Sequence, residues 1–372
     1  MNKTALPYYA KLAFVLMSLI AIGYIAILGK EVLAPLVFSF LFAMLLLPLT
    51  RFLEQKCRLP RAAAAMVSVI LFTGTIVLIG YAVGSQINNL SDDFPALKKQ
   101  ITQSYTEMNV WLETQFHINA SKQLTKIEKT GADSAGGIIS TTVLSISSIV
   151  LFLVFIFIYT SFILLYRKIL VGFLLKAFGK DSETLVFDIA EEIQNIMKKY
   201  ITGLFLEMVI VTAVVFGLLS IIGVKYALLL ALITGIFNLI PYVGIFTAMA
   251  LSSVLTLGTI GPAKALIVAV SIIGVHLVDS NLIMPRVVGS KVKLNALMVV
   301  LGVVVGEMIW GLSGMFLAIP VIAIIKIIFD RVEDLKPWGL LLGGEKDYGA
   351  AVVAAVAQEV EQEPVIEKEN EI

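Results

Sequence analysis

The segment that decides the fold of this chain is YALLLALITGIFNLIPYVGIFTAMALSSVLTLGTIGPA, which runs from Tyr226 to Ala263 without a charged side chain. Its 38 residues are too many for one membrane helix, because a bilayer core about 30 Å thick needs only roughly 20 helical residues. Pro241, near the middle, lacks a backbone N–H and obstructs the preceding helical turn. Backbone groups freed inside a membrane must find partners in protein or in a water-lined cavity. We therefore predict a broken helix here.

A second segment, Leu294 to Ile325, has the same character. Its 32 residues carry one charge, that of Glu307, and Gly311 and Gly314 interrupt it. It is also too long for an ordinary span. Two broken segments in one chain point to a transport site.

Six further apolar segments each have the length of a single span. They are Leu12–Gly29, Val32–Thr50, Ala62–Ser85, Val143–Tyr166, Ile201–Gly223 and Lys264–Met284. With 59% hydrophobic and 15% charged residues, the chain is predicted to be an all-α integral membrane protein with about eight hydrophobic segments. The first segment could pass for a signal peptide, but it has no convincing small-residue cleavage site and a second apolar segment follows at once, so an uncleaved span is preferred.

The composition excludes several classes of function. The formal net charge of +1 does not provide the basic surface of a nucleic-acid-binding protein. Cys57 is the single cysteine, and His117 and His276 are the two histidines, which leaves no internal disulfide and no His/Cys cluster for a metal. The sequence has no phosphate-binding loop, His-Glu-x-x-His motif or Gly-x-Ser-x-Gly motif, so we expect neither an enzyme nor a bound cofactor.

Four regions follow one another along the chain. Residues 1–85 hold the first three spans, and residues 86–137 form a polar insert whose apolar residues recur at three- and four-residue steps, which predicts helix. Residues 138–335 are predicted to form the transport core, in which an amphipathic helix over 181–200 lies on the cytoplasmic membrane surface. Residues 336–372 are Gly-rich and then acidic, which predicts a disordered tail.

Lysine and arginine predict the orientation, because in short loops these residues mark the cytoplasmic side. They place the N-terminus inside and the polar insert outside, as an extracytoplasmic cap. If the first broken segment crosses the membrane once, the loop carrying Arg286, Lys291 and Lys293 lies outside, against the rule. If both broken segments are re-entrant hairpins, that loop and the C-terminus lie inside, and only Lys264 is misplaced.

We prefer the hairpins over the spanning alternative. Each hairpin would then follow a full span, and these two spans would cross the membrane in opposite directions. Such a pair of units is an inverted repeat, which recurs in secondary transporters that bind their substrate near the bilayer midplane.

Four ionisable residues lie inside the predicted membrane segments: Glu207, His276, Asp279 and Glu307. A carboxylate at the bilayer centre costs roughly 2.5–3.5 kcal/mol on insertion scales, so such groups normally face a polar interior and serve function. The alternative for each is a structural pair or a position shallow enough to reach the lipid headgroups. We predict that these four residues couple transport to protons.

Two places combine an asparagine with a proline that frees backbone groups. Asn238 lies three residues before Pro241, and Gly244, which permits close backbone approach, follows. Asn281 and Pro285 repeat this order near the end of a span. The amides and the freed carbonyls could coordinate a cation or bind a polar solute, although a structural kink would also explain the prolines. The predicted binding residues, which include the second break, are Asn238, Pro241, Gly244, Asn281, Pro285, Gly311 and Gly314.

Three ordered motifs carry a resemblance to a known family. They are Asn-Leu-Ile-Pro-Tyr-Val-Gly at 238–244, Asn281-x-x-x-Pro285-x-x-x-Gly289, and Gly311-x-x-Gly314-x-x-x-Ala318-x-Pro320. In these motifs, and in order and spacing from about Lys3 to Leu335, the chain resembles the autoinducer-2 exporter family. The resemblance implies eight hydrophobic segments and either export of autoinducer-2 or sodium(lithium)/proton antiport. His276, where an amide is commoner, and Glu207 and Glu307 depart from the family pattern, which leaves the substrate open.

We therefore expect a multi-pass secondary transporter of a bacterial cytoplasmic membrane, with both termini in the cytoplasm. Its partners would be the lipid bilayer, protons, and either a small polar solute or Na⁺ or Li⁺, which it would export. A homo-oligomer, for which a pentamer is the specific expectation, is also compatible with the sequence. A passive channel and a non-transporting membrane scaffold are the alternatives, and an intramembrane enzyme lacks its motifs.

Overall fold

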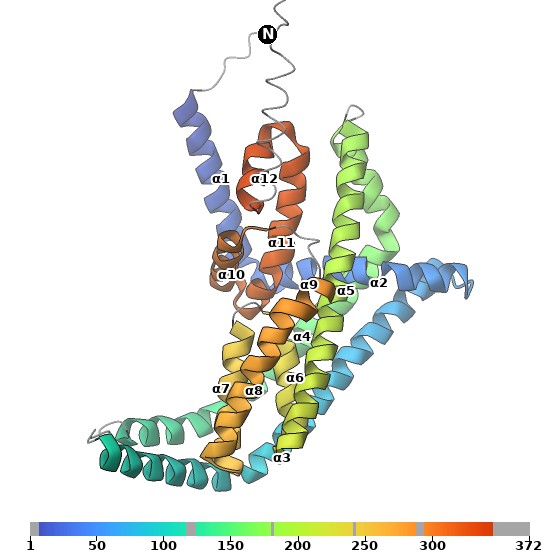
Figure 1. The fold of residues 1–372 in the computed structure, drawn as a ribbon. Coiled ribbons are helices and arrows are strands. Elements are labelled where there is room, and N and C mark those ends of the chain that lie inside the picture. The colour runs from blue at the N-terminus through green and yellow to red at the C-terminus, as the bar shows by residue number, and fades with distance from the viewer. Residues whose placement is uncertain (1–6, 117–123, 180–181, 241–242, 288–293, 345–372) are drawn as a thin grey trace, which may run out of the picture. The chain divides into compact units, whose positions relative to one another are not determined.

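The computed structural model describes residues 7–116, 124–179, 182–240, 243–287 and 294–344, and within them every regular element is a helix (Figure 1). No strand occurs in these ranges. The predicted all-α membrane fold is confirmed.

Seven helical stretches among the described residues are long and apolar enough to cross a membrane. They lie in α1 (Tyr8–Leu28), α2 (Lys30–Gln55), α3 (Arg61–Phe116), α4 (Leu124–Ala177), α5 (Glu183–Ile222), α8 (Pro262–Val278) with its continuation, and α11 (Leu312–Arg331). Each of the six predicted single spans overlaps one of the first six. The described parts of the polar insert, residues 86–116 and 124–137, continue α3 and α4 as helix. Their location outside the membrane stays a prediction.

The helix α5 differs from expectation because it is one uninterrupted helix of 40 residues. The sequence analysis divided it into a surface helix over 181–200 and a span from Ile201. No glycine or proline stands between Glu183 and Thr202, so nothing in the chain ends the helix there. At 1.5 Å per residue α5 is about 60 Å long, roughly twice the thickness of a bilayer core.

Both predicted breaks are present. The first segment forms α6 (Ala227–Phe237) and α7 (Val243–Thr259), with the chain leaving the helical path after Phe237. The second forms α10 (Ala296–Trp310) and α11, joined at Gly311, whose φ of +61° favours glycine. At 11 residues α6 is too short to span a membrane, whereas α11 alone is long enough. Whether the two pairs are re-entrant stays a prediction.

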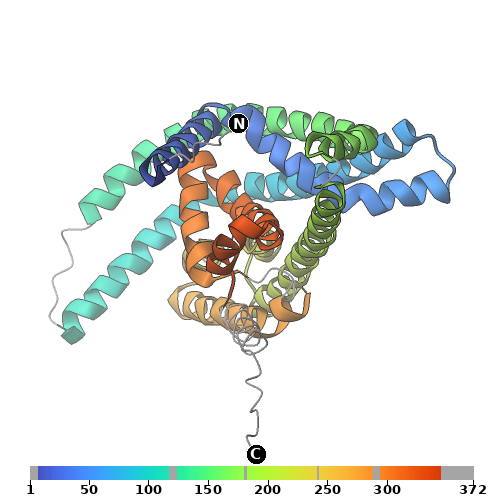
Figure 2. The same cartoon turned by 90° about the horizontal axis from the view of Figure 1, so that it is seen from above.

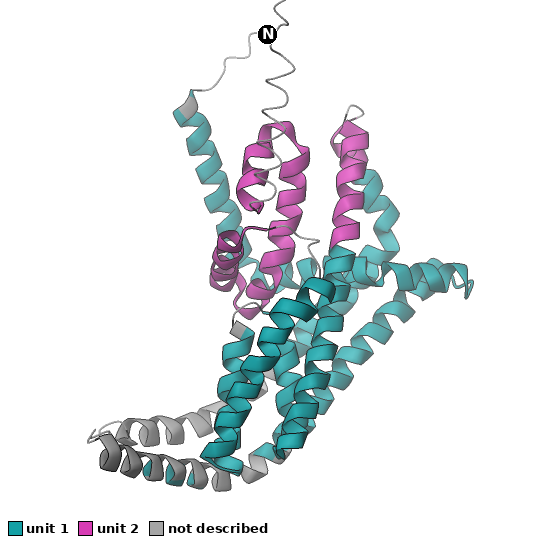
Figure 3. Cartoon of the chain, viewed as in Figure 1, with its two compact units in different colours: residues 1–173, 197–289 teal, residues 174–196, 290–372 magenta. Residues whose placement is uncertain are grey.

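The chain divides into two compact units, coloured in Figure 3. Unit 1 holds residues 1–173 and 197–289, and unit 2 holds residues 174–196 and 290–372. This division differs from the predicted regions. The prediction placed all of α5 in the transport core over 138–335, whereas α5 contributes residues to both units.

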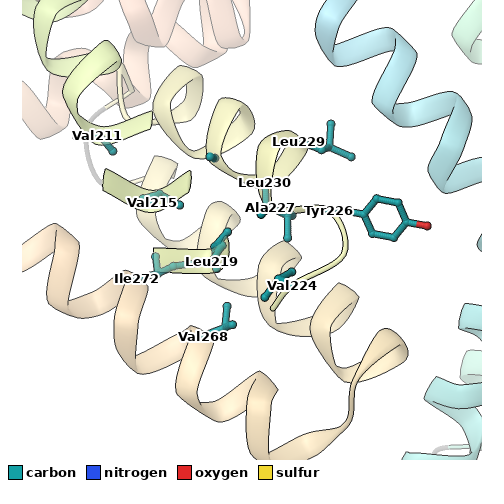
Figure 4. Close-up of a cluster of buried hydrophobic side chains, with 11 residues drawn as sticks. Val211, Val215, Leu219, Val224, Tyr226, Ala227, Leu229, Leu230, Val268 and Ile272 are labelled. Carbon is teal, nitrogen blue, oxygen red and sulfur yellow. The ribbon is translucent and has the colours of Figure 1, made fainter. Parts of the chain in front are cut away.

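One hydrophobic core of unit 1 lies between α5, α6 and α8. Figure 4 shows its apolar side chains pointing toward one another, among them Val215 and Leu219 of α5, Leu230 of α6, and Val268 and Ile272 of α8. Pro262 begins α8, where its missing N–H is harmless. Lys264, the one charge that opposes the predicted orientation, donates a 2.9 Å hydrogen bond from Nζ to the Ile222 carbonyl. It thus satisfies a free carbonyl at the end of α5.

Polar bonds join α2, α3 and α4 in the same unit. Thr50 Oγ1 of α2 donates to Ser68 Oγ of α3 at 3.0 Å, and Ser39 Oγ of α2 donates to the Ile156 carbonyl of α4 at 3.2 Å. Arg167 Nη2 of α4 donates to both oxygens of Glu54 of α2, at 2.8 and 2.7 Å. The three helices are therefore held by directional bonds as well as by apolar contact.

Unit 2 is built on the α10–α11 hairpin. A Cβ on either Gly306 or Gly314 would overlap backbone atoms of the other, so the two helix backbones touch there. The short helix α12 (Lys336–Leu342) lies beside α11 in both views (Figures 1 and 2). The Leu342 carbonyl accepts a 2.9 Å hydrogen bond from the N–H of Asn295.

The predicted disordered tail is therefore wrong at its start, over residues 336–342. Pro337 stands in the first turn of α12, where it favours helix, and the contact with α11 holds the turn in place. Residues 345–372 lie outside the described residues.

Candidate functional site

The amide of Asn238 joins two carboxyl groups in unit 1. Its Nδ2 donates to Glu207 Oε1 at 3.1 Å and to Asp279 Oδ2 at 3.0 Å. Glu207 lies on α5, Asn238 ends α6, and Asp279 follows α8. Three segments that are separate in the sequence therefore meet at one nitrogen, and we call these three residues the Asn238 node.

Both carboxyl groups of the node are buried. Glu207 is 4% exposed and Asp279 is 3% exposed. Glu207 Oε2 and Asp279 Oδ1 have no hydrogen-bond donor within the described ranges. Both carboxyl groups accept from the same nitrogen, so they lie side by side at one amide. A buried charge without a partner is costly, so this pair requires a proton or a cation.

A small cavity of about 10 Å³ adjoins the node, which is room for roughly one water molecule. Side chains from α5, α6, α7, α8 and the turn after α8 surround it. The lining residues are Val211, Val215, Thr234, Asn238, Gly244, Ile245, Ile272, Val275, His276 and Asp279. No lysine or arginine is among them, and neither is Glu207. The cavity therefore meets the node on the side of Asp279.

Two glycines allow the helices to come close enough for the node to form. A Cβ on Gly235 of α6 would overlap Thr212 Oγ1 of α5. A Cβ on Gly244 would overlap the carbonyl of Phe237, at the other side of the break. Close backbone approach at Gly244 was an inference from the sequence, whereas Gly235 was not singled out.

Asp279 begins a five-residue π-helical turn, Asp279–Ile283. Such turns are rare and occur often at functional sites, because the extra residue changes the direction of the side chains. Here Asp279 is buried, whereas Asn281 is exposed and donates from Nδ2 to the Leu277 carbonyl of its own helix at 2.8 Å. Pro285 is exposed in α9 (Met284–Val287). The structure does not bring Asn281 or Pro285 to the node.

His276 and Thr234 complete the polar lining of the cavity. His276 Nε2 lies 3.3 Å from Ser280 Oγ, and its buried Nδ1 has no partner in the described part of the chain. Thr234 Oγ1 donates to the Leu230 carbonyl at 2.6 Å. The sequence analysis missed Thr234, although its position one helical turn before Asn238 places both on the same face of α6.

Four predicted site residues remain. Glu307, Gly311 and Gly314 belong to unit 2, where Glu307 is exposed on α10. Pro241 lies outside the described residues. Among the residues that the structure describes, no group of three or more His, Cys, Asp and Glu side chains could hold a metal ion.

Comparison with known proteins identifies a family for this chain. Residues 13–334 match the family described as "AI-2E family transporter". The chain is similar to the "Putative transport protein YueF" of Bacillus subtilis, with 28% identity over 77% of this chain and 80% of the relative. It is also similar to the "Putative transport protein YrrI" of the same organism, with 27% identity over 80% of this chain and 86% of the relative. A further relative is the "Putative transport protein YhhT" of Escherichia coli K12, with 22% identity over 92% of this chain and 95% of the relative.

Proposed function

Since the chain belongs to the AI-2E family of transporters, we propose that it is a secondary transporter that exchanges a small monovalent cation, such as Na⁺ or Li⁺, for a proton at the Asn238 node. The cation would leave the cell as the proton enters. The bilayer is its environment, since seven helical stretches among the described residues can span one.

The observation that carries the proposal is the buried pair of carboxyl groups on one amide. Each carboxyl group has one oxygen without a donor among the described residues, and of these residues no lysine or arginine lines the adjoining cavity. Only a proton or another cation can neutralise such a site. Protons and small cations would therefore compete for the same oxygens, which is the requirement for exchange.

The broken helix supplies further ligands. The helix α6 ends at the node, and the C-terminal end of a helix carries partial negative charge. Secondary transporters coordinate Na⁺ or protons with such helix ends and with unwound carbonyls. The Asn238 side-chain oxygen would add a neutral ligand beside Asp279.

The size of the cavity favours a cation over an autoinducer-2-like solute. A volume of about 10 Å³ holds roughly one water molecule, whereas a solute of several heavy atoms would require the surrounding helices to separate. Export of a small polar solute remains the alternative that the family name suggests.

The test uses the purified full-length chain in proteoliposomes that contain a pH-sensitive dye. An imposed Na⁺ or Li⁺ gradient should drive saturable proton movement in the opposite direction, and Asp279→Asn should abolish it. An exposed aspartate on α5 gives the matched control, Asp188→Asn, which should behave as the parent. Non-saturable cation flux without proton movement would instead identify a passive channel.

A further inference from the structure

The two carboxyl groups of the Asn238 node are not equivalent. Asp279 lines the cavity and Glu207 does not, although both accept a hydrogen bond from Asn238 Nδ2. An ion that enters the cavity can therefore reach Asp279 directly, whereas Glu207 is not among the residues that line the cavity. This asymmetry assigns different tasks to the two groups.

We infer that Glu207 keeps a proton throughout the cycle and that Asp279 alone exchanges, so that one cation moves for one proton. This inference rests on the proposed function and specifies its stoichiometry. In it Glu207 is a positioning residue, which acts on the ion through Asp279.

Hydrogen-bond accounting supports one proton on the pair, and the position of Asp279 on the cavity assigns that proton to Glu207. Asn238 Nδ2 has two hydrogens, and both are used, one for each carboxyl group. Glu207 Oε2 and Asp279 Oδ1 are then left without donors among the described residues. A proton on Glu207 turns one of these acceptors into a donor, and the two carboxyl groups lie side by side because they share the Asn238 amide. One proton thus removes one unpaired acceptor and supplies a donor beside the other.

Repulsion between the two carboxylates supports the same protonation state, with Glu207 neutral. Two ionised carboxylates that share a buried site repel each other, and such pairs retain a proton. With Glu207 neutral, the node carries the single charge of Asp279, which one proton or one monovalent cation cancels. Both loaded states are then neutral, which suits a site that must move within a membrane. The titratable group that acts on Glu207 is Asp279, Glu207 in turn acts on Tyr200 of α5, and His276 lines the cavity beside Asp279.

Infrared spectroscopy of the purified chain tests the proton directly. At neutral pH the parent should show the carbonyl stretch of a protonated carboxylic acid, and Glu207→Gln should remove that band. Glu191→Gln, which changes an exposed carboxylate on the same helix, should leave it in place. A neutral-pH spectrum in which no band depends on Glu207 would overturn the inference.

Flux in proteoliposomes tests the stoichiometry. Glu207→Gln donates and accepts as the protonated acid does, so it should keep cation-coupled proton movement within about tenfold of the parent, while Glu207→Ala should lose it. A potential imposed with valinomycin and potassium should not change the exchange rate of the parent. A rate that follows the potential, or loss of coupling in Glu207→Gln, would overturn one-for-one exchange.

The infrared and flux experiments together also separate this inference from the proposed function. A parent that moves neither Na⁺ nor Li⁺ against protons would overturn the proposed function and the one-for-one exchange with it. The infrared band would still decide whether Glu207 holds a proton.

Discussion

The two broken helices of this chain look alike in sequence and differ in structure. The break after Phe237 leads into the Asn238 node, where a polar side chain reaches carboxyl groups on two other segments. The break at Gly311 is a tight turn, and the helices on either side touch through Gly306 and Gly314. An interrupted apolar segment therefore does not identify a binding site by itself. The first break becomes a candidate site because neighbouring helices bring ionisable groups to it.

The largest effect should separate the carboxyl groups of the two units. Asp279→Asn should reduce cation-coupled proton flux by about 100-fold or more, because the carboxyl group that binds the exchanging proton is lost. Glu307→Gln, which changes the exposed carboxylate near the second break, should change it less than about threefold. Dye-based flux in proteoliposomes measures both. A larger loss of flux in Glu307→Gln than in Asp279→Asn would contradict this distinction between the two units. It would support the proton-coupling role that the sequence predicts for Glu307.

The next effect concerns the asparagines of the two units. Asn238→Ala removes two hydrogen bonds to buried carboxyl groups, so the cation concentration for half-maximal flux should rise by about ten- to a hundredfold. Asn295 caps α10, where its side chain accepts from the N–H of Leu297 at 3.0 Å. Asn295→Ala should lower the stability by about 1 kcal/mol and leave that concentration unchanged. Equal effects on half-maximal flux would show that Asn238 acts only as a cap.

A smaller effect should come from glycines at the two backbone contacts. Gly244→Ala and Gly314→Ala each place a Cβ on backbone atoms, so each should destabilise the protein by about 1–3 kcal/mol in thermal unfolding. Only Gly244→Ala should also weaken cation binding, because Gly244 lines the cavity. Gly80→Ala meets open space and serves as the control, with unchanged or slightly higher stability. A weaker affinity in Gly314→Ala would contradict the distinction between the two breaks.

The smallest effect should come from Thr234. Its hydroxyl bonds to the Leu230 carbonyl of its own helix, so Thr234→Val keeps the shape and loses one weak bond beside the cavity. We expect a change in cation affinity of less than about fivefold. Competition between Na⁺ and Li⁺ in the flux assay measures it, with the exposed Thr202→Val of α5 as control. A larger loss would mean that the hydroxyl binds the ion directly.

The helices and their two breaks could be predicted because Pro241, Gly311 and the apolar lengths act locally. Glu207, Asn238 and Asp279 could be chosen because polar groups are rare in membrane segments. That they meet could not be predicted, since it depends on close contact at Gly235 and on the π-helical turn at Asp279. The same turn explains why Asn281, which the sequence pairs with Asn238, binds its own helix instead.

Two boundaries were also misjudged for local reasons. The change from polar to apolar composition at Tyr200 looks like the end of a surface helix, yet no glycine or proline interrupts the backbone there, and α5 continues to Ile222. The glycines after Lys336 suggest disorder, but contact with α11 stabilises a helical turn that the composition does not reveal.

The contact between Gly306 and Gly314 has a consequence for how this protein can evolve. Each glycine excludes a side chain at the other through backbone atoms rather than through a side chain that could shrink. No second substitution at the partner position can therefore rescue the first, since glycine is already the smallest residue. Substitutions in the hairpin are therefore expected mainly at exposed side chains of α10, such as Val304 and Met308, whose replacement leaves the glycine contact intact.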